Sequence, residues 1–205
     1  MPGVDVAWLL SAAGFALAMS ATPGPNNTML AASGANFGMA RSVPHILGVT
    51  VGFPVMFLGV ALGLGGAFNA YPAAYGVLRW VGAAYLLWLA WRIATARPGA
   101  KAASGRARPL HFLEAALFQW ANPKAWLAAV SGVAAYATES GRISSAQVLV
   151  LAGLFLLVTL PCITMWTSLG AGTARLLRND RQMRAFNIGM AALLVASVAG
   201  MLVEE

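Results

Sequence analysis

Two short segments of this chain place polar side chains beside helix breaks within apolar sequence. The first, Pro23 to Asn27, reads PGPNN, and the second is Asn122-Pro123-Lys124. Proline lacks a backbone N–H and the glycine relaxes φ, so a continuous helix cannot pass through the first segment. Broken backbone at membrane depth is tolerated only where protein or a water-filled cavity supplies hydrogen-bond partners. These segments therefore predict a polar site inside a membrane protein.

The carboxamides after the first break suit an amino-acid zwitterion. Asn26 and Asn27 can donate to a carboxylate and accept from an ammonium group. A helix that begins at Pro25 would also present free backbone N–H groups to a carboxylate. The alternative is that both side chains only cap helices and form hydrogen bonds between them.

Lys124 is the most costly residue to place in a bilayer. If its span begins near Phe112, the lysine lies about 12 residues, or roughly 18 Å, inside it. A charge near the middle of the bilayer core costs at least a few kcal/mol, which favours a functional, inward-facing lysine. The alternative is a span that starts at Pro123, with Lys124 reaching the interface.

Four polar residues have open roles. Glu114, near the cytoplasmic edge of that span, is our candidate proton carrier, although it could instead answer Arg108. Gln119 and Asn122 share roughly one helix face with Glu114, and that face could line a cavity. His45, at the start of another span, could relay protons, but such residues more often lie at the interface.

Composition sets the class of protein. Sixty per cent of the residues are hydrophobic, nine per cent are charged and the mean hydropathy is +0.73. The net charge is +7, but the basic residues lie between apolar segments, so they indicate membrane topology and not nucleic-acid binding. Cys162 is the lone cysteine, and no cluster of metal ligands or cofactor motif occurs, so we expect neither a metal nor a cofactor.

The apolar pattern predicts an all-α polytopic bundle that forms a single membrane domain over residues 1–205. Six segments are long enough to cross a bilayer: about 6–22, 43–69, 73–95, 112–137, 146–171 and 185–203. The first and fourth spans are broken, and residues 25–40 are either a half-helix or a re-entrant segment. Two halves, 1–95 and 110–205, each open with a broken span, which suggests an inverted 3+3 repeat.

Basic residues predict the orientation. Ten lie on one side of the predicted spans, against Arg79 and Arg142 on the other, with Lys124 left within a span. The ten are Arg41, Arg92, Arg97, Lys101, Arg106, Arg108, Arg175, Arg178, Arg181 and Arg184. Because cytoplasmic loops carry the excess of Lys and Arg, both termini are expected outside the cytoplasm.

The chain resembles the LysE/RhtB amino-acid exporters. The resemblance rests on PGPNN at 23–27, SGANFG at 33–38, PHILG at 44–48 and FQWANPKAW at 118–126. It implies a multi-pass inner-membrane protein, not an enzyme, that exports amino acids or close derivatives and exchanges them for protons. A neutral amino acid is preferred, because Glu114 is the one acid that could face a cationic substrate inside the membrane.

The expected partners are an amino-acid substrate, protons and lipid, and the oligomeric state is left open. A small-ion or metal efflux protein and a membrane-embedded enzyme are the alternatives, disfavoured by the lack of clustered ligands and of a nucleophile–base pair. The predicted substrate-binding residues are Pro23, Gly24, Pro25, Asn26, Asn27, Asn122, Pro123 and Lys124.

Overall fold

The computed structural model describes residues 4–64, 72–96, 108–137, 143–177 and 179–203, and every regular element in these ranges is helical. In chain order the elements are α1 (Val6–Ala21), α2 (Pro25–Phe37), α3 (Met39–Gly59), the π-helical turn η1 (Val60–Leu64), α5 (Pro72–Ala94), α6 (Phe112–Ala121), α7 (Pro123–Ala135), α8 (Ser145–Leu176) and α9 (Asp180–Val203). The all-α prediction is therefore confirmed for the described residues. Five residues of the orientation argument, Arg97, Lys101, Arg106, Arg142 and Arg178, lie outside them.

Four helical stretches are long and apolar enough to cross a membrane: Met39–Leu64, Gly76–Ala94, Ser145–Leu176 and Asp180–Ala199. α1 and α2 pass the same test together as a pair bent by 54°, which raises the number to as many as five. The chain is thus a multi-pass membrane protein. The residues of the predicted fourth span, 112–137, form two short helices, α6 and α7, which do not pass this test. At about 15 Å and about 20 Å, each is shorter than the roughly 30 Å hydrocarbon core.

Both predicted breaks are present, and each has a local cause. After α1, the backbone of Thr22 and Gly24 is extended, and α2 begins with Pro25 in its first turn, where a missing N–H costs nothing. Between α6 and α7, Asn122 is extended and Pro123 begins the next helix. Proline therefore starts a new helix on the far side of each break.

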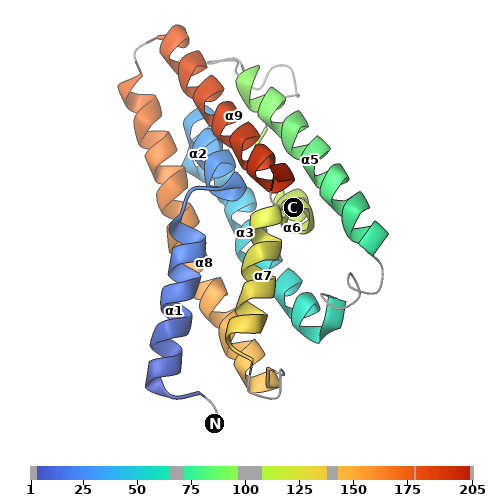
Figure 1. Cartoon of the computed structure of the whole chain (residues 1–205). Coiled ribbons are helices and arrows are strands. Elements are labelled where there is room, and N and C mark those ends of the chain that lie inside the picture. Colours follow the sequence, from blue (N-terminus) through green and yellow to red (C-terminus); the bar gives the residue numbers. More distant parts are fainter. Residues whose placement is uncertain (1–3, 65–71, 97–107, 138–142, 178, 204–205) are drawn as a thin grey trace.

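The first broken pair leads from one end of the bundle towards the other. In Figure 1, α1 rises from the N-terminal end, α2 continues to the opposite end, and α3 returns. We call that opposite end, which carries the connection between α8 and α9, the upper end. The reversal between α2 and α3 occurs at Gly38, whose φ of 79° favours glycine. Residues 25–37 therefore form a helix that is bent by 54° from α1, as in a broken span or a re-entrant segment.

The apolar core is divided into two clusters. The lower cluster packs α1, α3, α7 and α8, with Ala12, Phe57 and Phe155 among its buried members. The upper cluster packs α2, α3, α5, α6, α9 and one residue of α8, Ile163, and includes Leu30 and Phe118. The two halves of each broken pair thus belong to different clusters, and the breaks lie where the clusters meet.

A close crossing holds α2 against α8. A Cβ atom on Gly34 would overlap the backbone carbonyl of Thr167, and one on Gly170 would overlap that of Ala31. Only glycine at both positions allows the two backbones to approach this closely, as is common where helices pack in membranes. The upper half of the first broken pair is therefore fixed to the long helix α8.

Candidate functional site

A cavity of about 50 Å³ lies at the junction of the two clusters, and residues from both breaks line it. The first break contributes Gly24, Asn26 and Asn27, and the second contributes Asn122 and Lys124. Apolar walls come from α3 and α8 through Val49, Phe53, Phe155 and Ile163. The predicted residues Pro23, Pro25 and Pro123 lie at the breaks but are not among those that line this central cavity.

Lys124 points into the first break. Its Nζ donates to the carbonyl of Thr22 at 2.6 Å, to the Thr22 hydroxyl at 2.7 Å and to the carbonyl of Pro23 at 3.3 Å. These acceptors match the three N–H bonds of an ammonium group and lie at the negative end of the α1 dipole. Glycine makes room for the lysine stem, because a Cβ on Gly24 would lie 2.7 Å from its Cδ. Within the described ranges, no carboxylate pairs with Lys124.

Side chains also satisfy the other carbonyls that the first break frees. Asn27 donates through Nδ2 to the carbonyls of Ser20 at 2.9 Å and Thr22 at 2.7 Å. The indole of Trp166, on α8, donates to the carbonyl of Ala21 at 3.1 Å. Buried backbone polar groups in a membrane protein need such partners. In this conformation Asn27, which is buried, therefore stabilises the break itself.

A reciprocal amide pair joins the two broken pairs across the cavity. Asn26 Nδ2 donates to Gln119 Oε1 at 2.8 Å, and Gln119 Nε2 donates back to Asn26 Oδ1 at 3.2 Å. Gln119 also donates to the carbonyl of Ala115 within α6 at 2.9 Å. The glutamine, which we expected to face a cavity, is fully buried and reaches the site through Asn26.

Comparisons with known proteins identify the family of this chain. The family described as LysE type translocator matches residues 17–205. This chain belongs to that family. A cysteine/O-acetylserine efflux protein of Escherichia coli (strain K12) is 32% identical over 182 residues, 88% of this chain and 90% of that protein. A protein of the same name from Salmonella typhimurium is 35% identical over 125 residues, 60% of this chain and 62% of that protein. No solved structure matches significantly.

The candidate proton carrier of this LysE type translocator lies apart from the central cavity. Glu114 forms a two-pronged ion pair with Arg108, in which both N–O distances are 2.6 Å. The hydrogen bonds to Glu114 raise the pKa of Arg108 above its ordinary value. Glu114 also accepts from the backbone N–H of His111 at 3.0 Å, so it caps α6. This is the pairing with Arg108 that the sequence left open, and a role in proton transfer stays a prediction.

His45 is not the interfacial side chain that its position beside Pro44 suggested. It is 2% exposed, and neither ring nitrogen has a hydrogen-bond partner among the described residues. The reason is that α3 begins at Met39, about one turn before the predicted start, which places His45 deeper in the helix.

Two hydroxyl residues of the central cavity were missed in the sequence. Ser20 and Thr159 line it and share a hydrogen bond of 3.0 Å between their hydroxyls. Each lies within three residues of a proline in an apolar span, and that proximity was the available signal. Within the described ranges, no group of three His, Cys, Asp or Glu residues could hold a metal ion. The polar groups of the cavity are thus amides, hydroxyls, carbonyls and one ammonium.

Proposed function

We propose that this LysE type translocator exports a small neutral amino acid, or a close derivative, through the central cavity. The observation that carries the proposal is Lys124, an ammonium group that links the two breaks without a carboxylate partner in the described residues. A substrate carboxylate is the natural counter-charge for it. The relatives named cysteine/O-acetylserine efflux protein support the substrate class, because both named compounds are small amino acids with uncharged side chains.

The lysine and the carbonyls that it binds are complementary to a zwitterion. The substrate carboxylate would replace the Thr22 and Pro23 carbonyls on Lys124, since hydrogen bonds between two charged groups are stronger than those to a neutral carbonyl. The released carbonyls would then accept from the substrate ammonium. The start of α2, which has no side-chain cap, offers further backbone N–H groups to the carboxylate. Binding would thus exchange a contact within the protein for two contacts with substrate.

The small cavity implies that the breaks must separate during transport. A volume of about 50 Å³ holds only a few waters, since each needs roughly 10–15 Å³. The cavity of this conformation is therefore too small to hold an amino acid. Because α1 and α7 pack in the lower cluster and α2 and α6 in the upper one, we infer that helix segments move relative to each other at the two breaks and expose the site alternately.

We further propose six crossings within one domain, with α1–α2 and α6–α7 as the broken first and fourth spans of an inverted 3+3 repeat. The basic residues then place the upper end in the cytoplasm and both termini outside it. Export would be coupled to proton uptake through Glu114, for which the ion pair with Arg108 must open.

Counterflow in proteoliposomes tests the export proposal. Vesicles loaded with unlabelled O-acetyl-L-serine should accumulate labelled O-acetyl-L-serine and L-cysteine, whereas labelled L-lysine and L-glutamate should stay near background. An imposed pH gradient should accelerate net transport of the accepted substrates. Failure to accumulate any amino acid would refute the proposed function, and saturable flux without a response to pH would refute only the proton coupling.

A further inference from the structure

A second, larger cavity lies at the upper end of the bundle, between α2, α3, α5 and the segment that precedes α6. Its volume is about 460 Å³, within the roughly 300–1,000 Å³ typical of small-molecule sites. We call it the vestibule, and the residues of its lining that carry the argument are Met29, His45, Trp88, Arg92 and Arg108. It is large enough for an amino acid, unlike the central cavity.

The vestibule contains an unsatisfied polar side chain. His45 lines it, is 2% exposed, and has no hydrogen-bond partner for either ring nitrogen among the described residues. Buried polar side-chain atoms are nearly always hydrogen-bonded, so an orphaned imidazole points to a ligand. A neutral imidazole offers one acceptor nitrogen and one N–H donor.

One face of α3 connects the vestibule with the central cavity. His45, Val49 and Phe53 recur every four residues and therefore share that face. His45 lines the vestibule, whereas Val49 and Phe53 line the central cavity, about one helical turn further along. Met29, which also lines the vestibule, belongs with Val49 to the upper apolar cluster. The two cavities are thus neighbours along one path, with apolar side chains between them.

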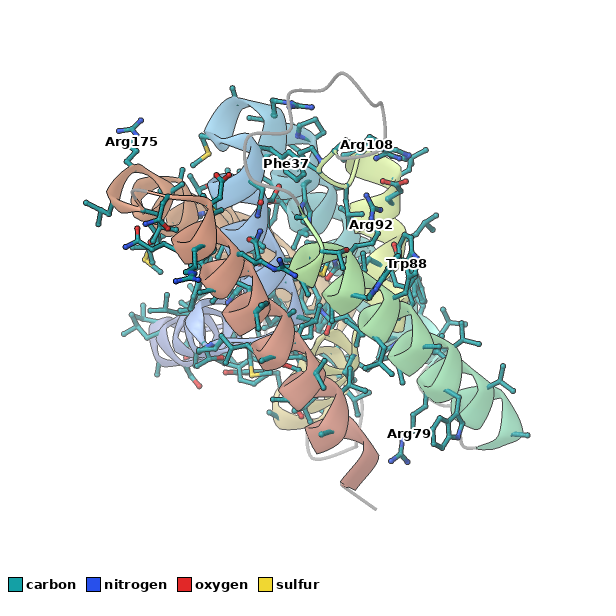
Figure 2. All side chains as sticks on the ribbon, turned by 90° about the horizontal axis from the view of Figure 1, so that it is seen from above. Phe37, Arg79, Trp88, Arg92, Arg108 and Arg175 are labelled. Carbon is teal, nitrogen blue, oxygen red and sulfur yellow. The ribbon has the colours of Figure 1, made fainter. Side chains whose placement is uncertain are left out.

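The vestibule also offers a positive charge without a carboxylate. The Arg92 guanidinium lies over the ring of Trp88, 4.9 Å from its centroid, and forms no ion pair within the described residues. Stacking of this kind fixes the guanidinium plane and leaves its N–H fork free for a carboxylate. Arg108, by contrast, is engaged with Glu114. Figure 2 shows Arg92 and Trp88 together, with Arg79 at the other end of the same helix.

We propose that the vestibule is a second amino-acid binding site, which the substrate occupies before it reaches the central cavity. Arg92 binds the carboxylate, and the acceptor nitrogen of His45 receives a hydrogen bond from the ammonium group. This proposal rests on the proposed export function, because it names the same substrate class. It adds a distinct location, reached from the upper end.

Sided kinetics in phosphatidylcholine–phosphatidylglycerol proteoliposomes test the vestibule. An Arg175→Cys change places a thiol at the upper end of α8, in a Cys162→Ser background. A membrane-impermeant thiol reagent then labels and blocks the protein molecules whose upper end faces the outside of the vesicle. His45→Leu and Arg92→Gln should each raise the KM for O-acetyl-L-serine about tenfold at the vestibule face, as expected for a lost hydrogen bond to a charged group. The KM at the opposite face should stay within twofold of the unsubstituted value.

Matched variants separate binding from damage to the fold. Arg79→Gln removes the same charge from the far end of α5 and should leave both KM values unchanged. His45→Gln keeps an acceptor and should restore most of the affinity. Arg92→Lys keeps the charge but loses the planar N–H fork, so it should restore only part of the affinity. An equal rise of KM at both faces would overturn the vestibule site.

Two further outcomes decide against the proposal in different ways. Unchanged KM values in His45→Leu and Arg92→Gln, with normal counterflow, would overturn the vestibule and leave the export function standing. A KM shift that occurs only after phosphatidylethanolamine is added would assign the vestibule to a lipid headgroup. Absence of any saturable flux in the unsubstituted protein would instead overturn the export function itself.

Discussion

The two helix breaks differ in where their hydrogen-bond partners come from. At the second break, Asn122 supplies its own cap, because its side-chain oxygen accepts the backbone N–H of Lys124 at 3.2 Å. At the first break, the carbonyls of Ala21, Thr22 and Pro23 depend on donors from α2, α7 and α8, and α2 has no side-chain cap. The second break is locally complete, whereas the first is completed by distant parts of the chain.

This difference assigns the breaks different tasks. The backbone of a self-capped break is held in one conformation, so the second break keeps Lys124 in a fixed position. A break whose partners lie on other helices can exchange them, so the first one can release its carbonyls when a competing ligand arrives. Lys124 is the charged donor that these carbonyls could exchange for a ligand. Removal of its charge is therefore the strongest test of the difference between the two breaks.

Lys124→Met should abolish transport. The change keeps most of the side-chain length but removes the ammonium group. The substrate carboxylate would then enter the site without a counter-charge, and a buried charge without its partner typically costs about 3–5 kcal/mol. We therefore expect the rate of O-acetyl-L-serine counterflow to fall by about a hundredfold or more. Arg181→Met, which removes the same charge from the exposed start of α9, is the control and should transport normally. A folded Lys124→Met protein that retains half of its activity would reduce the lysine to a structural partner of the break.

The breaks were predictable because their cause is local. Proline alone does not end a helix in this chain, because Pro44, Pro54 and Pro161 lie inside α3 and α8. Residues 23–25 and 122–123 indicate interruptions because a glycine and a second proline, or an asparagine that caps the next helix, stand beside the proline. The inward direction of Lys124 followed from the length of its span. The partners were not predictable, because Asn26 and Gln119 are 93 residues apart and Lys124 and Thr22 are 102 apart. No short-range pattern specifies which distant carbonyl or amide a polar side chain meets.

The amide pair between Asn26 and Gln119 should behave as a coupled unit that joins the two breaks. Asn26→Leu or Gln119→Leu alone leaves one buried amide without a partner, which typically costs about 1–3 kcal/mol. The double variant removes both amides, so its loss should be smaller than the sum of the two single losses. Hydrogen bonds between membrane helices give coupling energies of about 0.6 kcal/mol, with a maximum near 1.7 kcal/mol.

A double-mutant cycle on the purified protein in detergent measures this coupling through the free energies of unfolding. Strictly additive losses would show that the pair does not connect α2 to α6. Gly14→Ala is the control, because a new Cβ at this position meets no atom within 4 Å. Its free energy of unfolding should stay close to that of the unsubstituted protein.

Asn122→Ala should affect folding more than transport. Loss of a helix cap typically costs about 1 kcal/mol, and this cap stabilises the start of α7, which carries Lys124. Asn122→Asp keeps an accepting oxygen and should be closer to the unsubstituted protein in unfolding temperature. We expect Asn122→Ala to retain most of its counterflow at a temperature well below its unfolding transition. Complete loss of flux in a stably folded variant would mean that Asn122 contacts the substrate, which is the role the sequence suggested for it.

The smallest effect on stability is expected from Glu114→Gln. Its ion pair with Arg108 is partly exposed, with side-chain exposures of 32% and 48%, and such pairs contribute about 0–1 kcal/mol. The informative measurement is therefore the response of transport to a pH gradient. If Glu114 carries the coupled proton, Glu114→Gln should keep amino-acid exchange but lose acceleration by the gradient.

Arg108→Gln is the matched variant, because it opens the same ion pair but leaves the carboxyl group available for protons. It should therefore keep the response to the pH gradient. If Glu114→Gln still responds to the gradient, another group must carry the coupled proton. The alternative that Glu114 only caps α6 and pairs with Arg108 would then hold.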